Sequence, residues 1–120
     1  MKLASMIENV THVCESLSVN AKAEYRTPLG SRIDIALFKE NKPALAIEFE
    51  NSYKWIAQRV LYNGIKAHAA GFDTILFICP FQKEFTNKLV LAHLEHLGVR
   101  VYFSDKNTYQ DAIFSIVKDI

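Results

Sequence analysis

IDIALFKENKPALAIEFE, residues 33–50, contains two apolar runs separated by the polar segment KENKP. Short apolar runs bounded by polar and turn residues predict two β-strands joined in a hairpin. Because apolar residues occupy consecutive positions in each run, both strands should be covered on both faces. Nevertheless, the first run contains Asp34, and the second contains Glu48 and Glu50. An ionised carboxylate in such surroundings is costly unless it is paired or bound to a cation.

The residues around this hairpin predict a single α/β domain. Apolar spacing and the positions of Gly and Pro give the element boundaries. The predicted elements are a helix at 3–17, strands at 19–25, 32–38 and 44–50, a helix at 53–70, a strand at 73–80, a helix at 81–97, a strand at 99–103 and a helix at 108–119. This order predicts a mixed central sheet flanked by helices on both faces. We expect one domain over residues 1–120.

The composition limits which partners and which cellular compartment fit this protein. The 14 Lys and Arg residues nearly balance the 13 Asp and Glu residues, so a surface for a polyanion must come from local arrangement. Cys14 and Cys79 are isolated, which argues against a disulfide framework or a thiolate zinc site and favours buried thiols in a reducing compartment. The N-terminal segment does not read as a secretion signal, and no window approaches the ~18 apolar residues of a membrane span. We therefore expect a soluble cytoplasmic protein that does not contact a membrane.

The three acids are predicted to converge. Glu48 and Glu50 are two residues apart on one strand, so their side chains should emerge on the same face roughly 6.6 Å apart. Asp34 lies within the adjacent strand, and an ordinary hairpin register brings it close to them. Such a cluster would take up a proton or recruit a hard dication such as Mg²⁺, Mn²⁺ or Ca²⁺. The alternative is that the acids lie on the solvent face of an edge hairpin, but their apolar flanks argue against it.

The acidic motif consists of Asp34, Glu48 after thirteen intervening residues, and Glu50. With its three strands preceded by a helix and followed by a helix and a strand, it resembles the PD-(D/E)xK nuclease superfamily, which includes restriction enzymes, Holliday-junction resolvases and recombination exonucleases. The resemblance covers about residues 3–103 and implies a restriction endonuclease-like αβββαβ core. It also implies that Asp34, Glu48 and the main-chain carbonyl of Phe49 bind Mg²⁺ or Mn²⁺.

Two positions depart from the superfamily pattern. Ile33 replaces the Pro of the motif name, which members often lack. Glu50 occupies the position where members usually have a Lys that orients or deprotonates the attacking water. Glu50 could instead act as general base or hold a second metal ion, and Lys54 could supply the missing cation from the start of the next helix. Resolvase-like members often place a fourth acid in the first helix, here Glu8, although the helical angle directs it away from the apolar stripe.

Basic and aromatic residues near the acids are candidate contacts to nucleic acid. In the helix at 53–70, the predicted core stripe is Ile56, Ala57, Val60, Leu61, Gly64 and Ile65. Polar and aromatic residues on its other side and in the strands before Asp34 are Lys54, Gln58, Arg59, Tyr62 and Lys66, and Lys22, Arg26 and Arg32. Such residues bind phosphates and stack on bases. Gln58 and Tyr62 also resemble the QxxxY element of recombination exonucleases, whereas an ordinary solvated helix face is the alternative.

Together these features predict a Mg²⁺- or Mn²⁺-dependent nuclease that hydrolyses phosphodiester bonds in DNA, with Asp34 and Glu48 holding the metal and Glu50 positioning the water. A chain this short has little room for a base-reading module, so we expect structure- or end-selective cleavage. Paired cuts would require a homodimer, whose candidate interface residues are Tyr102, Phe103, Tyr109, Phe114 and Ile116, with a position in the plain core favoured for most of them. The alternatives are a catalytically inactive module that binds nucleic acid or protein, and a domain that binds a small anionic metabolite.

Overall fold

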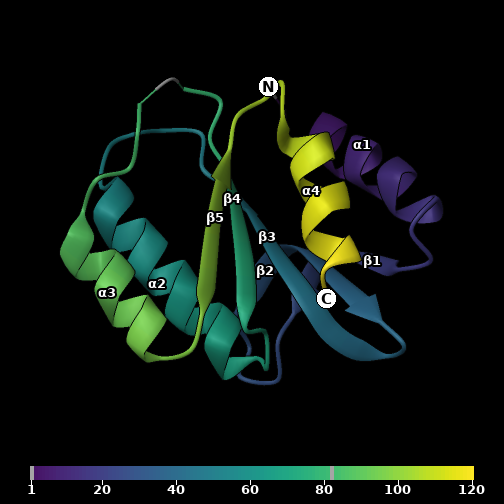
Figure 1. The fold of residues 1–120 in the computed structure, drawn as a ribbon, viewed down its shortest axis with the longest axis horizontal. Helices are drawn as coiled ribbons and strands as arrows, with labels where there is room; N and C mark the ends of the chain where they lie inside the picture. The colour runs from purple at the N-terminus through teal and green to yellow at the C-terminus, as the bar shows by residue number, and fades with distance from the viewer. Residues whose placement is uncertain (1, 82) are drawn as a thin grey trace.

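The computed structural model describes residues 2–81 and 83–120, and within them the chain follows the predicted order of elements (Figure 1). The helices are α1 (Leu3–Glu15), α2 (Ile56–Ala69), α3 (Lys88–His96) and α4 (Tyr109–Lys118). The strands are β1 (Asn20–Arg26), β2 (Arg32–Lys39), β3 (Lys42–Phe49), β4 (Thr74–Ile78) and β5 (Arg100–Ser104). The prediction of an α/β domain with a mixed sheet is confirmed.

Two predicted helix starts are wrong. α2 begins at Ile56 rather than at residue 53, because Trp55 has a left-handed backbone with a φ of 59°. α3 begins at Lys88 rather than at residue 81, where the Asn87 side chain caps the helix by accepting a hydrogen bond from the Val90 amide at 3.0 Å. Before this cap, Phe85 stacks on Phe103 of β5 with ring centroids 5.1 Å apart. The segment before α3 therefore packs against the sheet instead of forming helical turns.

The strands form one sheet in the order β1-β2-β3-β4-β5. β1, β2 and β3 pair antiparallel as a meander, whereas β3, β4 and β5 pair parallel. α2 connects β3 to β4 and α3 connects β4 to β5, because parallel neighbours require a crossover. The carboxyl ends of β3, β4 and β5 therefore lie at the same edge of the sheet.

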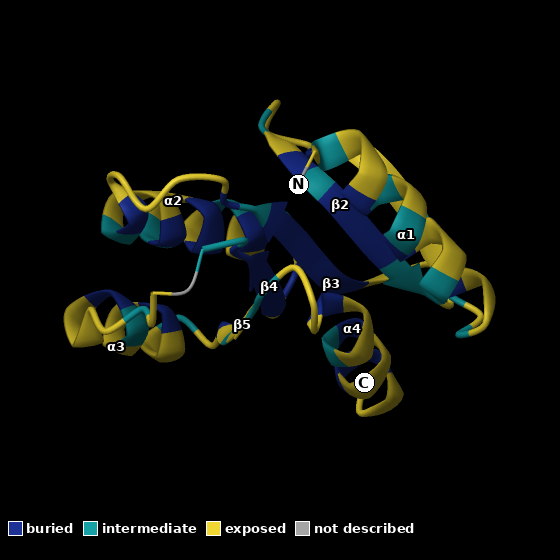
Figure 2. Cartoon of the chain, turned by 90° about the horizontal axis from the view of Figure 1, so that it is seen from above, coloured by how far each residue is buried: buried dark blue, intermediate teal, exposed yellow. Residues whose placement is uncertain are grey.

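Helices cover both faces of the sheet, with α1 and α4 on one face and α2 and α3 on the other (Figures 1 and 2). The core against α1 and α4 includes the fully buried residues Met6, Val10, Leu45, Ile47 and Ile113. The core against α2 and α3 includes the buried residues Val60, Phe72, Ile75, Phe77 and Leu94. The central strands β2, β3 and β4 are mostly dark blue in Figure 2, the colour of buried residues. This position explains why acids on β3 cannot reach bulk water freely.

The two cysteines are buried, as the sequence predicts. Cys14 and Cys79 are buried and free, and burial raises the pKa of each thiol to about 11. Both thiols therefore remain protonated near neutral pH. Among the described residues, no helix has the length and apolar character needed to cross a membrane.

Candidate functional site

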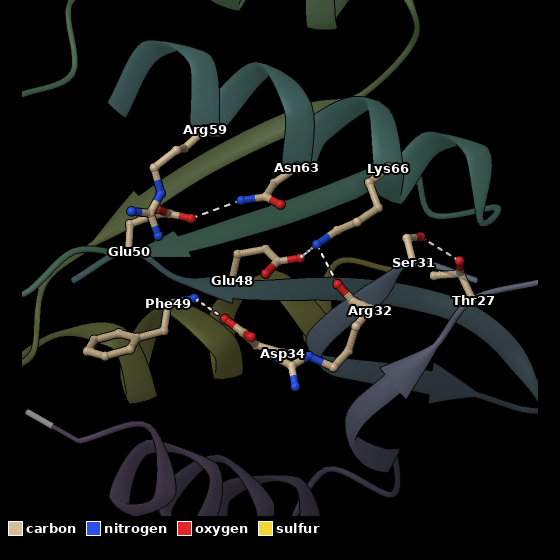
Figure 3. A network of polar contacts seen from close by, with 10 residues as sticks. All are labelled: Thr27, Ser31, Arg32, Asp34, Glu48, Phe49, Glu50, Arg59, Asn63 and Lys66. Atoms are coloured by element: carbon tan, nitrogen blue, oxygen red, sulfur yellow. Dashed lines mark hydrogen bonds and ion pairs between the residues drawn. The ribbon is translucent and has the colours of Figure 1, made fainter. Parts of the chain in front are cut away.

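The end of β3 and the helix α2 enclose a buried polar layer (Figure 3). Glu48 is the second-last residue of β3, and Glu50 follows the strand directly. Their exposed fractions are 3% and 2%. β3 is also the central strand of the sheet. The alternative of acids on a solvated edge hairpin is therefore excluded.

Lys66 of α2 neutralises Glu48. Its Nζ lies 2.8 Å from Glu48 Oε2 and also donates a hydrogen bond to the carbonyl oxygen of Arg32 on β2. The Lys66 side chain is only 9% exposed. The ammonium thus faces the sheet and not, as the helical pattern suggested, the outer side of the helix. A Lys is buried to this degree only when it is paired.

Glu50 is bound by two other side chains of α2. Arg59 Nε lies 2.6 Å from Glu50 Oε2, and Asn63 Nδ2 donates a hydrogen bond to Glu50 Oε1 at 2.9 Å. Asn63 is buried, whereas the Arg59 side chain is 46% exposed. Arg59 therefore connects the buried layer to the surface. The sequence reasoning did not identify Asn63.

Arg59, Asn63 and Lys66 form a polar stripe on α2, spaced by four and then three residues as neighbours on one helix face are. Glu50 contacts the first part of this stripe and Glu48 contacts its end. From the midpoint of Arg59 and Asn63 to Lys66, the helix rises about 7.5 Å. Alternate strand residues are roughly 6.6 Å apart, which is nearly the same distance. This matched spacing is the sequence signal that could have identified the stripe.

Asp34 approaches the same strand end from β2. Its Oδ2 accepts a hydrogen bond from the Phe49 amide at 2.8 Å (Figure 3). The alternation along β2 is broken here, because Ile33 and Ala36 both belong to the core beneath α2, whereas Ile35 belongs to the opposite core. The N–H and C=O groups of one strand residue point to the same neighbouring strand. The Phe49 carbonyl therefore faces the side of β3 on which Asp34 lies.

Burial controls the protonation of the acids. It raises the pKa of Glu48 to about 8, although Lys66 lowers that pKa and the Asp34 carboxylate raises it further. Burial also raises the pKa of Glu50, and Arg59 opposes this effect. Glu48 Oε2 and Glu50 Oε2 are buried, and each lies against a cation of α2, Lys66 Nζ at 2.8 Å and Arg59 Nε at 2.6 Å. These cations offset part of the cost of burying the two acids.

The oxygen donors at this site fit a hard dication in part. Asp34 and Glu48 lie close enough for the charge of Asp34 to raise the Glu48 pKa, and Glu48 Oε2 also contacts Lys66 Nζ at 2.8 Å. Glu50 is bound by Arg59 and Asn63 of α2. Within residues 2–81 and 83–120, no three Asp, Glu, His or Cys side chains are arranged to hold a metal ion. A Mg²⁺ ion would rely on two carboxylates, the Phe49 carbonyl and water or substrate oxygens, a ligand set that Mg²⁺ accepts.

The catalytic candidate Lys54 and the candidate metal ligand Glu8 lie away from the acids. Lys54 is exposed in the turn before α2, where its amide donates a hydrogen bond to Ser52 Oγ at 3.1 Å. Its side chain forms no ion pair with a described acid, so the cations beside the acids are those of Lys66 and Arg59. Glu8 is exposed on α1, which packs against the opposite face of the sheet.

The candidate nucleic-acid contacts on β1, β2 and α2 are mostly at the surface. Gln58 and Arg26 are exposed, and Tyr62 is 62% exposed. Lys22 Nζ lies 4.7 Å from the centroid of the Phe38 ring. Arg32 NH1 lies 3.3 Å from Glu24 Oε1 in an exposed ion pair. All of these cations keep access to solvent, whereas Lys66 does not.

One predicted core residue needs correction, and two of the interface candidates lie in the core. Ile65, predicted as core, is 41% exposed, because the buried side of α2 is turned toward Asn63 and Ala67. Tyr109 and Ile116, considered for a dimer interface, are 1% and 7% exposed and belong to the core against α1. The other interface candidates, Tyr102, Phe103 and Phe114, are partly exposed.

Comparison with known proteins gives no assignment: neither a family model nor a curated sequence matches the chain. The function is therefore inferred from the geometry of the site.

Proposed function

We propose that this protein is a metal-dependent nuclease that hydrolyses phosphodiester bonds in DNA, on a restriction endonuclease-like core. The observation that carries the proposal is the contact of Lys66 Nζ with Glu48 Oε2 at 2.8 Å, beside Asp34 at the end of β3. Two carboxylates and an ammonium are thereby grouped in a site with little water. Such a group is expected where a hard cation and a phosphate are handled together.

The chain offers ligands for Mg²⁺ or Mn²⁺ in the carboxylates of Asp34 and Glu48 and the carbonyl of Phe49. When bound, such an ion supplies Lewis acidity toward a phosphoryl oxygen and lowers the pKa of a coordinated water. Glu48 has a pKa of about 8, so near neutral pH it must release a proton before it can bind a cation. Binding should therefore strengthen as pH rises toward 8.

In the proposed site, Lys66 takes the place of the cation that is missing at position 50. A carboxylate at position 50 cannot supply the positive charge that the superfamily pattern expects there. Lys66 supplies it from α2, because its ammonium contacts Glu48 directly. In the proposed reaction this ammonium stabilises negative charge that develops on the phosphate. Glu50, whose Oε2 also contacts Arg59 Nε at 2.6 Å, is the proposed acceptor for the proton of the attacking water.

In this proposal, the cations at the surface bind phosphates of the substrate next to the site. Arg59 is about half exposed and is anchored by Glu50, so its free N–H groups can reach a phosphate next to the site. Lys22, Arg26 and Arg32 lie on β1 and β2. Lys66 itself joins α2 to β2 through the Arg32 carbonyl. This arrangement supports backbone binding rather than sequence reading, and thus structure- or end-selective cleavage.

The first experiment is a cleavage assay. Purified protein is incubated with Mg²⁺ or Mn²⁺ and linear, branched or single-stranded DNA. We expect metal-dependent cleavage that falls at least about 100-fold in Asp34→Asn and in Lys66→Met, since each removes a group that acts on the transition state. Glu95→Gln is the matched control, because it removes an exposed acid of α3 and should leave cleavage unchanged. Circular dichroism checks that each variant is folded.

The second candidate function is a catalytically inactive module that binds nucleic acid or a protein. It is favoured by the closed pairing of Glu50 with Arg59 and Asn63, which resembles a structural ion-pair network. Titration of the wild type with Mn²⁺, followed by calorimetry, separates the two functions. Saturable binding that is lost in Asp34→Asn supports the nuclease. Absence of both Mn²⁺ binding and cleavage on every DNA substrate would support the module.

A further inference from the structure

A pocket of about 660 Å³ lies at the carboxyl ends of β4 and β5. Its walls are mainly aromatic and aliphatic side chains, which include Tyr53, Phe81, Phe85, Tyr102 and Phe103. Several of these rings pack against one another. Phe85 and Phe103 are stacked with centroids 5.1 Å apart, and Tyr53 meets Phe81 edge to face at 5.3 Å. Tyr53, Tyr102 and Phe103 are 36–41% exposed, so part of each ring faces solvent.

Polar groups are interspersed among these rings. Lys83 Nζ lies 4.5 Å from the centroid of the Tyr53 ring, and it lines the pocket together with Glu84 and Asp105. Ser104, at the end of β5, also lines the pocket, and its buried hydroxyl has no hydrogen-bond partner among the described residues. An apolar pocket with a few convergent polar groups is the usual form of a ligand site.

Backbone hydrogen bonds connect this pocket to the acidic site. The Glu50 amide donates to the Ile78 carbonyl of β4 at 3.0 Å, and the Cys79 amide donates to the Ser104 carbonyl of β5 at 2.8 Å. Glu50 and Ser104 are thus at the ends of strands separated only by β4. Two strand spacings amount to about 10 Å. A ligand that places a charged group beside the acids and a planar group in the pocket can therefore occupy both sites at once.

We infer that the pocket binds an unpaired nucleobase of a single-stranded DNA segment whose phosphodiester lies beside Asp34 and Lys66; this inference rests on the proposed function. A base is planar, stacks on aromatic rings irrespective of sequence, and carries donors and acceptors on its edge. The acids of the pocket, Glu84 and Asp105, can meet that edge. Lys83 and Arg59 supply positive charge for the adjoining phosphates. The substrate class is thus DNA with a single-stranded end, gap or branch rather than continuous duplex.

Binding is measured in EDTA, so that it does not depend on metal or cleavage. The probes are a short fluorescein-labelled oligothymidylate and an abasic strand of equal length and equal charge, followed by fluorescence anisotropy. We expect the strand with bases to bind at least about tenfold more tightly, as stacking of one base provides. Tyr53→Ala and Tyr102→Ala should each reduce this preference severalfold. Phe114→Ala is the matched control, because Phe114 is 44% exposed on α4 and lies outside the pocket.

The outcomes separate this inference from the proposed function. Equal affinity for the two strands would overturn the base pocket, even if the protein cleaves DNA with Mg²⁺. A loss of preference in Phe114→Ala as large as in Tyr53→Ala would also overturn it. Saturable binding of a fluorescein-labelled aromatic tripeptide that is lost in Tyr53→Ala, without binding of oligothymidylate, would overturn the base pocket and assign it to a protein partner. A base preference that is lost in Tyr53→Ala, in a protein that never cleaves DNA, would support the pocket and refute the nuclease.

Discussion

The two faces of the sheet use the same strands for different chemistry. Ile35 of β2 pairs with Ile47 of β3, and both side chains are fully buried against α1 and α4. The adjacent pair, Ala36 and Ala46, belongs to the core beneath α2. Ala is short and leaves room above the strands for long polar side chains. Glu48 lies two residues after Ala46 on the same side of β3. One face of the sheet is therefore filled by branched aliphatic residues, whereas the other face carries ion pairs.

The apolar face against α1 and α4 stabilises the fold, whereas the polar layer beneath α2 holds the candidate functional groups. Burial of apolar side chains stabilises the fold with no charge to desolvate. In a buried ion pair, the cost of desolvation offsets most of the attraction, so the layer beneath α2 adds little net stability. Departures from an apolar core are expected at functional sites. Substitutions on the two faces should therefore differ in their dependence on pH and in their effect on activity.

The largest expected effect on stability is that of Lys66→Met. Removal of Lys66 leaves Glu48 buried without its cation, which destabilises a protein by about 3–5 kcal/mol. Because Glu48 can take up a proton, the loss should be full at pH 9 and smaller at pH 6. Urea unfolding at both pH values measures it. The double variant Glu48→Gln/Lys66→Met should be more stable at pH 9 than Lys66→Met alone.

Ile47→Ala is the matched variant on the opposite face. Truncation of a fully buried Ile costs about 2–5 kcal/mol through lost burial and the cavity left behind. No titratable group is involved, so the loss should be equal at pH 6 and pH 9, and activity per folded molecule should be retained. If Lys66→Met showed the same pH independence, the ion pair with Glu48 would not determine the behaviour of that face.

The wild-type protein itself should become less stable as pH rises through the Glu48 pKa. A carboxyl group whose pKa is raised by folding stabilises the folded state fully below its ordinary pKa of 4.5, and that contribution is lost as pH rises through about 8. The slope from this group is at most about 1.4 kcal/mol per pH unit. We expect Glu48→Gln to reduce the loss of unfolding free energy between pH 6 and pH 9. Identical pH profiles for the two proteins would contradict the raised pKa.

Most of the fold could be predicted from local sequence patterns. The alternation around Tyr25, the apolar runs on both sides of KENKP and the stops at Gly71 and Gly98 are signals carried by neighbouring residues. The start of α3 could not be predicted in this way. It depends on the contact of Phe85 with Phe103, which are distant in sequence, and on the cap at Asn87. Tertiary packing here overrides a helical pattern.

The site was predicted only in part, for a similar reason. The sequence predicted buried acids, and Glu48 and Glu50 are buried as expected. It did not predict that Lys66 faces inward, because an isolated helix hides Ile65 more readily than Lys66. α2 is oriented so that Arg59, Asn63 and Lys66 contact Glu48 and Glu50. The periodicity of the helix alone does not show which side of α2 faces the sheet. The match between the spacing of the two acids on β3 and the spacing of the polar residues on α2 does show it.

The smallest expected effect concerns the contact between α2 and α3, and it tests how tightly α2 is held over the acids. A Cβ atom on Gly64 would lie 2.5 Å and 2.7 Å from the two Cδ atoms of the buried Leu94. Ala gains about 1 kcal/mol over Gly in a helix, but overpacking costs about 1–3 kcal/mol. Gly64→Ala should therefore lose about 1 kcal/mol in urea unfolding. In a Leu94→Val background, which lacks those Cδ atoms, the same substitution should become neutral or stabilising. A loss that persists there would show that α2 is fixed by its polar contacts with β3 rather than by packing against α3.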